Sequence, residues 1–410
     1  MENLRINSDR LWQALMDLAK IGATPKGGVC RLALSDLDKQ GRDLVSGWCK
    51  DAGLALTTDQ LGNIFARRAG SNNNLPPVMA GSHIDTQPSG GKFDGNYGVM
   101  AALEVVRTLN DHNIQTEAPL EVCIWTNEEG SRFQPVMMGS GVFANIFPLE
   151  QALSAKDVEG KNVRDELKRI GYAGNAPVGE HPGAAYFEAH IEQGPILEQR
   201  KITIGVVLGS LGSRWYDVTF SGQDNHAGTT PMDARKDALL GAANLIAEVN
   251  RIGASDEFGR GTVGFIQVKP NSRNVVPGEV RMSVDLRHPN AETLLAMDAR
   301  LRATCEKIRK DLGLQLQIVQ VSYFEPTAFN TELVDSVRAC AGALKYSHMD
   351  VVSGAGHDAV YLARVIPTAM IFVPCEGGIS HNEVESATPQ DLAAGCNVLL
   401  QVMVERAQER

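Results

Sequence analysis

The segment at residues 76–98 constrains the fold of this 410-residue chain more than any other. Its apolar start at 78–80 is typical of a buried strand that ends at Gly81, and ligand sites in open α/β sheets lie just beyond such strand ends. His83 and Asp85 follow directly, and residues two apart point the same way in extended backbone. We therefore expect the Asp85 carboxylate to bind the second imidazole nitrogen of His83, the outer partner that metal-binding histidines commonly have.

Turn-forming residues continue this segment. Gly90-Gly91 and Asp94-Gly95 let the chain fold back and bring Asp94 to the same point as His83. A single histidine beside an aspartate is more commonly a satisfied pair in the core or at the surface than a ligand. The residues at the ends of the other strands decide whether His83 is interpreted as a ligand or as part of a satisfied pair.

Strands and helices alternate through the first half of the chain. Residues 99–109 have helical periodicity and residues 119–126 read as a strand, so with 78–80 they predict a βαβ unit and a mainly parallel sheet. Glu128 and Glu129 come immediately after the second strand. Adjacent carboxylates at a strand end are expected to point to opposite sides, so that one binds a metal and the other faces a substrate. A solvated turn is the plain alternative for such a pair.

Further helices and strands are predicted from periodicity and from turn residues. Helices are expected at 8–20, 36–52 and 331–345, and from Pro389 onward. Strands are expected as a pair within 55–66, and at 185–193, 202–208 and 368–373. His190 lies in the strand at 185–193, and His381 lies in the loop after the strand at 368–373.

A chain of 410 residues is too long for one compact core, so two domains are expected. The pattern changes after Arg214, where strands at 215–220, 261–269, 279–287 and 314–321 accompany helices at 231–250 and 291–312. This predicts an inserted α+β domain at 210–322 within a catalytic domain formed by 1–209 and 323–410. The glycine-rich stretch at 209–213 matches no phosphate-binding fingerprint and is interpreted as a hinge between the domains.

Composition excludes several classes of protein. Hydrophobic residues make up 43% and charged residues 21%, no apolar run reaches membrane-helix length, and the N-terminus lacks a signal-peptide pattern, so a cytoplasmic globular protein is expected. The seven cysteines are widely spread without a Cys-x-x-Cys pair, which indicates free thiols. A net charge of −10 without basic runs argues against nucleic acid as a partner. The lack of a long apolar run argues against a membrane as a partner.

Five candidate ligands share one placement, just beyond or late in a predicted strand: His83, Asp94, Glu129, His190 and His381. Imidazole nitrogens and carboxylate oxygens are ligands that zinc and manganese take. Five ligands exceed the need of one catalytic zinc with an open position, but they suit two metals with a bridging carboxylate, which lower the pKa of a bridging water and polarise a carbonyl. Glu128, beside Glu129, is then the natural general base and proton shuttle.

Six ordered blocks resemble the amidase/hydantoinase/carbamoylase branch of the M20 metallopeptidase family, over nearly the whole chain. The blocks are Gly-Ser-His-Ile-Asp-Thr at 81–86, Gly-Gly-Lys-Phe-Asp-Gly at 90–95, Asn-Glu-Glu-Gly-Ser-Arg-Phe at 127–133, Glu-Ala-His-Ile-Glu-Gln-Gly-Pro at 188–195, Asn-His-Ala-Gly-Thr-Thr-Pro-Met at 225–232 and Gly-Ile-Ser-His-Asn-Glu at 378–383.

The resemblance implies a dimetal catalytic domain on a mixed sheet, interrupted by a lid domain that also forms a homodimer. It implies two divalent ions per subunit, Zn²⁺ or Mn²⁺ with Co²⁺ possible in vitro, held by the five ligands above with Asp94 as the bridge. Glu128 would be the acid/base, and a non-proline cis peptide bond would follow Asp94.

The resemblance also implies roles for residues whose spacing alone indicates only a surface or helix-capping position. His226 would stabilise the developing oxyanion and reach a neighbouring subunit's site. Arg287 would bind the substrate carboxylate bidentately. The other substrate-binding residues would be Gln193, Asn274 and the backbone at Gly356, Gly377 and Gly378. The role of His357 is left open, with support of the ligand side chains preferred, and His112, His181, His288 and His348 are interpreted as structural.

The implied reaction is hydrolysis of the ureido C–N bond of an N-carbamoyl-L-amino acid or N-carbamoyl-β-alanine, a small substrate with a carboxylate, to the amino acid, ammonia and CO₂. Allantoate amidohydrolase is the alternative with the same carboxylate-plus-ureido chemistry. An M20-type aminopeptidase or dipeptidase and a non-catalytic binding protein are the remaining alternatives.

Overall fold

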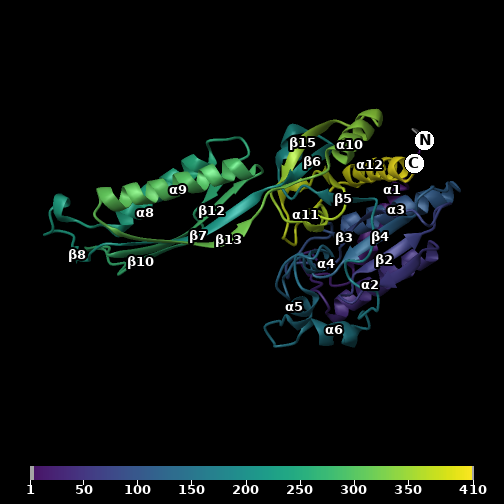
Figure 1. Cartoon of the computed structure of the whole chain (residues 1–410), viewed down its shortest axis with the longest axis horizontal. Coiled ribbons are helices and arrows are strands. Elements are labelled where there is room, and N and C mark those ends of the chain that lie inside the picture. The colour runs from purple at the N-terminus through teal and green to yellow at the C-terminus, as the bar shows by residue number, and fades with distance from the viewer. Residues whose placement is uncertain (1–3, 409–410) are drawn as a thin grey trace. The chain divides into compact units, whose positions relative to one another are not determined.

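The computed structural model describes residues 4–408 and divides into two compact units. Unit 1 runs to Leu208 and resumes at Phe329, and unit 2 spans Gly209–Ala328. Unit 2 extends past the expected boundary at 322 because strand β13 runs to Phe324 and β14 follows at Thr327–Ala328. Figure 1 shows the helices and strands of both units.

Unit 1 is built on a mixed sheet, as the sequence predicts. Its strands, in spatial order, are β1 (Ala55–Thr58), β2 (Ile64–Arg68), β4 (Leu120–Trp125), β3 (Val78–His83), β5 (Ala185–Ile191), β16 (Thr368–Val373) and β6 (Ile204–Ser210), with β15 (His348–Ser353) beside β6. The central four, β4, β3, β5 and β16, run parallel, and the strands that flank them are antiparallel. Every residue of these four is buried, which explains their apolar composition, because both faces of a parallel sheet are covered.

The helices of unit 1 cover this sheet. The long ones are α1 (Ser8–Ala19), α2 (Asp36–Asp51), α3 (Asn96–Asp111), α10 (Thr331–Ala343) and α12 (Pro389–Gln408), and the short ones are α4 (Met138–Phe143), α5 (Leu149–Ser154), α6 (Val163–Ile170), α7 (Ile196–Arg200) and α11 (Asp358–Leu362). Helices α1, α3 and α12 pack together, and α4 packs on α11 (Figure 1). Within residues 4–408, no helix combines the length and apolar character needed to cross a membrane.

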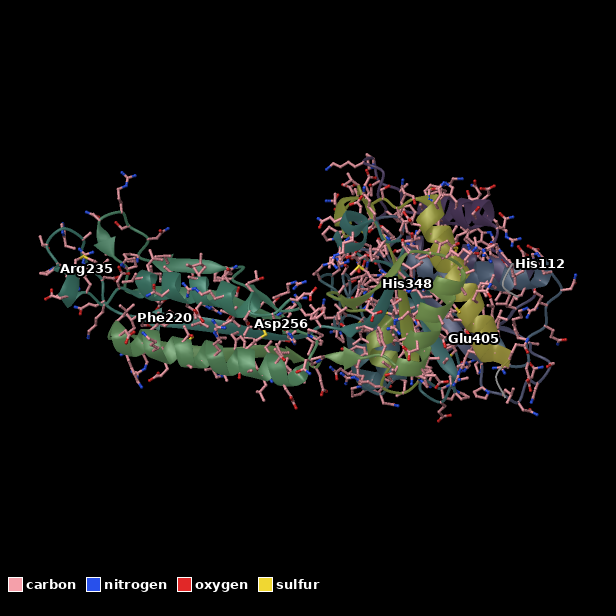
Figure 2. The ribbon with its side chains drawn as sticks, turned by 90° about the horizontal axis from the view of Figure 1, so that it is seen from above. His112, Phe220, Arg235, Asp256, His348 and Glu405 are labelled. Atoms are coloured by element: carbon pink, nitrogen blue, oxygen red, sulfur yellow. The ribbon has the colours of Figure 1, made fainter. Side chains whose placement is uncertain are left out.

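Unit 2 has an antiparallel sheet with two helices on one face. The sheet order is β10 (Ile266–Lys269), β12 (Glu279–His288), β7 (Gly212–Ser221) and β13 (Gln315–Phe324), with β9 (Arg260–Thr262) beside β12. Helices α8 (Ala238–Gly253) and α9 (Ala291–Asp311) bury their apolar faces against the sheet, where Phe220 is fully buried (Figure 2). A separate ladder joins β8 (Asn225–His226) to β11 (Val275–Val276).

Two sequence predictions for these elements are wrong in detail. Helix α8 begins at Ala238 rather than 231, because the Asp237 carboxylate caps it by accepting from the amides of residues 239 and 240. The strand expected at 261–269 is broken into β9 and β10. The glycine-rich stretch at 209–213, interpreted as a hinge, lies where unit 1 ends and unit 2 begins, and largely within β6 and β7. Two elements were not predicted: α11 has too few residues to show a helical period, and β15, His-Met-Asp-Val-Val-Ser, is neither a continuous apolar run nor an alternation of apolar and polar residues.

Candidate metal centre

The candidate ligands converge because the four central parallel strands end at one edge of the sheet. Each strand end or the loop after it supplies one or two of them: β3 ends at His83, Glu128 and Glu129 follow β4, β5 carries His190, His381 follows β16, and Asp94 precedes α3. Helix α3 begins at Asn96 after Gly95, whose φ of +65° turns the chain at this point.

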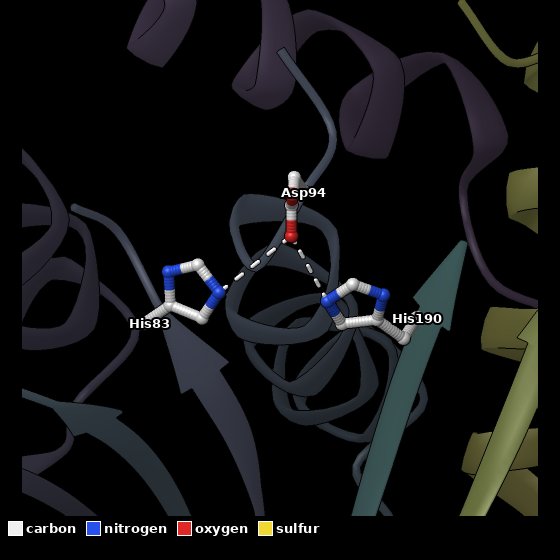
Figure 3. Close-up of side chains that lie close together, drawn as sticks. All are labelled: His83, Asp94 and His190. Atoms are coloured by element: carbon white, nitrogen blue, oxygen red, sulfur yellow. Dashed lines mark ion pairs between the residues drawn. The ribbon is translucent and has the colours of Figure 1, made fainter. Parts of the chain in front are cut away.

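A first cluster consists of three buried side chains, His83, Asp94 and His190. The Asp94 Oδ1 atom lies 3.2 Å from His190 Nε2 and 3.7 Å from His83 Nε2. Figure 3 shows both imidazoles pointing at this one oxygen from neighbouring strands. Two nitrogens and one oxygen therefore face a common point.

A second cluster consists of Asp94, Glu129 and His381. The Asp94 Oδ2 atom lies 3.2 Å from His381 Nε2, which is also 3.5 Å from Glu129 Oε2. Asp94 thus turns one carboxylate oxygen to each cluster, which is the arrangement of a carboxylate that bridges two cations.

The hydrogen bonds of the buried imidazoles fix their tautomers. His83 Nδ1 donates to the backbone carbonyl of Asp85 at 2.9 Å, and His190 Nδ1 donates to that of Ile191 at 2.9 Å. A carbonyl only accepts, so the proton of each neutral ring is on Nδ1 and the lone pair is on Nε2, beside Asp94. The Nε2 atom of His190 also accepts from the amide of Gly95 at 3.2 Å. This donor set fits divalent cations such as zinc or manganese.

The expected contact between the Asp85 carboxylate and His83 is not formed. The distance from His83 Nδ1 to Asp85 Oδ1 is 3.8 Å, and the backbone carbonyl takes the hydrogen bond instead. The Asp85 carboxylate accepts from the amides of Glu128 and Glu129, each at 3.3 Å. Asp85 therefore supports the site by holding the loop after β4.

Glu128 and Glu129 line one cavity rather than opposite sides of a strand. The chain leaves β4 at Trp125, and Asn127 takes a φ of +55°, so the alternation of an extended strand no longer applies. Glu128 Oε2 lies 3.5 Å from His83 Nε2, whereas Glu129 faces His381. The two carboxylates thus approach different histidines.

Burial and crowding strongly perturb the acids and bases of this site. Burial raises the pKa of Glu128 and raises that of Glu129 to about 7, and neighbouring carboxylates add to both shifts. The hydrogen bond to Asp94 raises the pKa of His381 to about 9. For His83, burial opposes a rise in pKa, but the charges of Glu128 and Asp94 outweigh it. This concentration of negative charge favours the binding of cations.

The cavity beside the clusters has a volume of about 220 Å³. Gln193, Gly356 and His357 line it together with four of the candidate ligands, which are His83, Asp94, Glu129 and His381. Gln193 Nε2 donates to Asp94 Oδ2 at 2.9 Å, and the His357 ring packs on His190 with centroids 4.5 Å apart. A side chain at position 356 would crowd Met137, because a Cβ atom added to Gly356 would lie 3.1 Å from the Cε atom of Met137.

Gly377 and Gly378 are not among the described residues that line this cavity. The amide of Gly377 donates to Glu198 Oε2 at 2.8 Å, and that of Gly378 to the carbonyl of Cys375 at 3.1 Å. Their expected place in the same pocket is therefore not seen in this structure.

Three further candidates belong to unit 2, where β8 and β11 bring two of them together. His226 is exposed on β8, and the carbonyl of Asn274 accepts from the amide of Ala227 at 2.8 Å. Arg287 lies on the face of β12 opposite the helices and binds both carboxylate oxygens of Asp285, with distances from 2.9 to 3.2 Å.

His226 is held as a hydrogen-bond donor. Its Nδ1 accepts from the amides of Gly228 at 3.0 Å and Thr229 at 3.2 Å. An amide only donates, so the proton of the neutral ring is on Nε2. The remaining N–H is the group that an oxyanion would need.

The cis peptide bond expected after Asp94 is not formed. Within residues 4–408, the cis bonds are Gln134-Pro135 and Lys269-Pro270. The loop is instead held by the buried carboxylate of Glu385, which accepts from the amides of Phe93 at 2.9 Å and Asp94 at 3.1 Å. Sequence reasoning missed Glu385, because no local pattern pairs it with a loop almost 300 positions earlier.

Sequence reasoning also missed Gln87 and Ser380. Gln87 Nε2 donates to Glu129 Oε2 at 2.6 Å, and Ser380 Oγ lies 3.2 Å from Asp94 Oδ2. Both residues adjoin blocks singled out in the sequence, Gln87 after the block at 81–86 and Ser380 within 378–383, which is the only signal that pointed to them.

The histidines set aside as structural have local partners. His112 and His348 (Figure 2) bind the backbone carbonyls of Thr108 and Tyr346 through Nδ1, at 3.0 and 3.1 Å. The two others contact acids, His181 with Glu121 at 2.5 Å and His288 with Asp256 at 3.0 Å.

Comparison with known proteins identifies the family. Peptidase family M20/M25/M40 matches residues 79–405. An N-carbamoyl-L-amino-acid amidohydrolase of Rhizobium meliloti is 48% identical over 99% of this chain and 98% of its own length. A crystal structure of an amidase of the hydantoinase/carbamoylase family from Burkholderia multivorans is 58% identical, covers 99% of both chains and superposes with a TM-score of 0.97.

A more distant relative has a different name. A ureidoglycolate hydrolase of Oryza sativa is 34% identical over 97% of this chain and 84% of its own length. The ordered blocks of the sequence, the mixed sheet and these matches agree. This chain belongs to peptidase family M20/M25/M40, in its branch of hydantoinase/carbamoylase amidases.

Proposed function

We propose that this protein is a metal-dependent amidohydrolase that cleaves the ureido C–N bond of N-carbamoyl-L-amino acids or N-carbamoyl-β-alanine, giving the amino acid, ammonia and CO₂. The observation that carries the proposal is the pair of clusters that share Asp94, with Glu128 beside them. The name of the relative that is 48% identical over nearly the full length supports this substrate class.

Two divalent ions would occupy the site, with Zn²⁺ or Mn²⁺ as the candidates and Co²⁺ as a substitute in vitro. His83, Asp94 and His190 would hold one ion, and Asp94, Glu129 and His381 the other. Bound there, such ions supply Lewis acidity for the ureido carbonyl and lower the pKa of water.

Glu128 is the proposed acid/base. Its carboxyl is buried beside the clusters, where burial raises its pKa, and a carboxyl can both accept and return a proton. It takes a proton from the attacking water and delivers it to the leaving ureido nitrogen.

Unit 2 is the proposed lid and supplies the groups that recognise substrate. His226 Nε2–H stabilises the developing oxyanion, and Arg287 binds the substrate carboxylate with help from Asn274 and Gln193. In this structure two nitrogens of the Arg287 guanidinium bind the carboxylate of Asp285. A substrate carboxylate would take over this role of Asp285.

Ammonia release tests the proposal directly. The protein, stripped of metal and reloaded with Zn²⁺, Mn²⁺ or Co²⁺, is expected to hydrolyse N-carbamoyl-L-methionine or N-carbamoyl-β-alanine, and the preferred one assigns the product class. Arg287→Met is expected to raise KM for these carboxylates about 10-fold or more, because a charge-assisted bidentate pair is lost. No turnover of any ureido or peptide substrate by the metal-loaded protein would refute the proposal and favour a binding protein.

Hydrolysis of another ureido acid, such as allantoate, is a second candidate function. The ureidoglycolate hydrolase relative favours it, because its named substrate also combines a ureido group with a carboxylate. Turnover of allantoate with both carbamoyl compounds inert would select this candidate. Cleavage of a dipeptide alone would instead indicate an aminopeptidase or dipeptidase.

We place the reaction in the cytoplasm and in a homodimer. The seven cysteines are all free thiols, which suits a reducing compartment. Strand β13 is an edge of the unit 2 sheet and exposes Val319, Val321 and Tyr323, and such an edge can pair with a second copy.

Solution mass tests the homodimer. Light scattering is expected to give twice the 44.2 kDa chain mass, and Val321→Lys is expected to shift the protein toward monomer by placing a charge on the edge strand. Glu332→Lys, on an exposed turn of α10 in unit 1, is the control that should leave the mass unchanged. A parent protein of 44.2 kDa at micromolar concentration would contradict the proposal.

A further inference from the structure

The two clusters differ in how firmly their side chains are held. His83, Asp94 and His190 are buried, with 2%, 6% and 1% of their surface exposed. In the second cluster the His381 side chain is 51% exposed and lies in a loop. The geometry of the second cluster therefore depends on the contacts that hold Glu129.

Glu129 is fixed at two points. Its amide donates to Asp85 Oδ2 at 3.3 Å, which holds the backbone. Its carboxylate atom Oε2, the one nearest His381, accepts from Gln87 Nε2 at 2.6 Å. Gln87 is thus the side chain that directs the Glu129 carboxylate toward the second cluster.

Gln87 is itself held in one orientation. Ser131 Oγ lies 2.7 Å from Gln87 Oε1 and donates to it. An ionised carboxylate only accepts, so the amide NH₂ group must face Glu129 and the amide oxygen must face Ser131. The NH₂ group has no lone pair available for a cation, so Gln87 acts on a metal only through Glu129.

We propose that Gln87, oriented by Ser131, is a positioning residue that sets the metal affinity of the Asp94–Glu129–His381 cluster and leaves that of the buried His83–Asp94–His190 cluster unchanged. The inference rests on the proposed dimetal function. Partners that orient a metal-binding side chain typically contribute 10–100-fold to metal affinity.

Calorimetric titration of the stripped protein with Zn²⁺ or Mn²⁺ tests this. The parent is expected to bind two ions, and Gln87→Met, which keeps the length but removes the amide, is expected to bind one of them about 10–100-fold more weakly. Ser131→Ala should change the same ion in the same direction by less. Gln134→Met is the matched control, because the Gln134 amide binds the carbonyl of Gly130 at 2.7 Å in the same loop and touches no ligand.

A second background identifies which ion is affected. His381→Ala is expected to bind a single ion, and adding Gln87→Met to it should leave the affinity for that ion unchanged. Weaker binding of the single ion in the double variant than in His381→Ala would overturn the role of Gln87. Equally weaker binding of both ions in Gln87→Met, or unchanged affinity for both, would overturn it too. A parent protein that binds only one ion would overturn the dimetal function as well, so the two failures are distinguishable.

Discussion

Glu128→Gln is expected to lower kcat by about 10²–10⁴-fold while both metal ions stay bound, because glutamine has nearly the same shape but cannot accept and return a proton. Glu128 belongs to neither ligand cluster, and its Oε2 atom lies 3.5 Å from His83 Nε2. The measurement is kcat on the preferred carbamoyl substrate together with the metal content by elemental analysis.

Glu150→Gln is the matched control for this substitution. The Glu150 side chain is 77% exposed and pairs with Arg164 at the surface, so its replacement should leave kcat unchanged. Equal activity of Glu128→Gln and the parent would show that another group moves the proton. Loss of metal from Glu128→Gln would instead move Glu128 into the ligand set.

Asp94→Asn is expected to remove turnover and to reduce binding of both ions, the largest effect on metal content of any single substitution in the site. Each Asp94 carboxylate oxygen faces one cluster, at 3.2 Å from His190 Nε2 and 3.2 Å from His381 Nε2. Asparagine has one oxygen and no charge, so it cannot serve both clusters. The measurement is the number of ions bound after dialysis, with His381→Ala as the comparison that should lose only one.

The loop that carries Asp94 should keep its shape in this variant. Glu385 binds the backbone amides of Phe93 and Asp94, and neither contact involves the Asp94 side chain. A dialysed Asp94→Asn protein that retains two ions with parent affinity would contradict the bridging role. A variant that loses one ion only would assign Asp94 to a single cluster.

Local sequence patterns predicted most elements of the fold. Continuous apolar runs specified the central strands, because a parallel strand covered on both faces requires them, and strand ends specified where His83 and Glu129 would lie. The patterns failed where an element is too short for a period, as in α11, or where a strand shows neither an apolar run nor alternation, as in β15. They also failed where a cap decides the start, as Asp237 does for α8.

The candidate ligands were predictable from the sequence for the same reason. His83 and His190 lie late in strands, and Asp94, Glu129 and His381 lie in the segments after strands, so the type of element and the chemistry of the residue were enough to select them as candidates. Their division into two clusters was not predictable. It depends on which oxygen of Asp94 faces which imidazole, and side-chain orientation follows from packing rather than from spacing.

Patterns along the chain were thus enough to predict the mixed sheet and to select the groups that are candidates to hold cations. The partners that support those groups are visible only in the folded chain: Asp85 holds a backbone rather than an imidazole, Glu385 holds the Asp94 loop, and Gln87 directs Glu129. The reason is physical. Periodicity and turn chemistry act between neighbours along the chain, whereas a buried polar group takes whichever partner the folded core brings within hydrogen-bond distance.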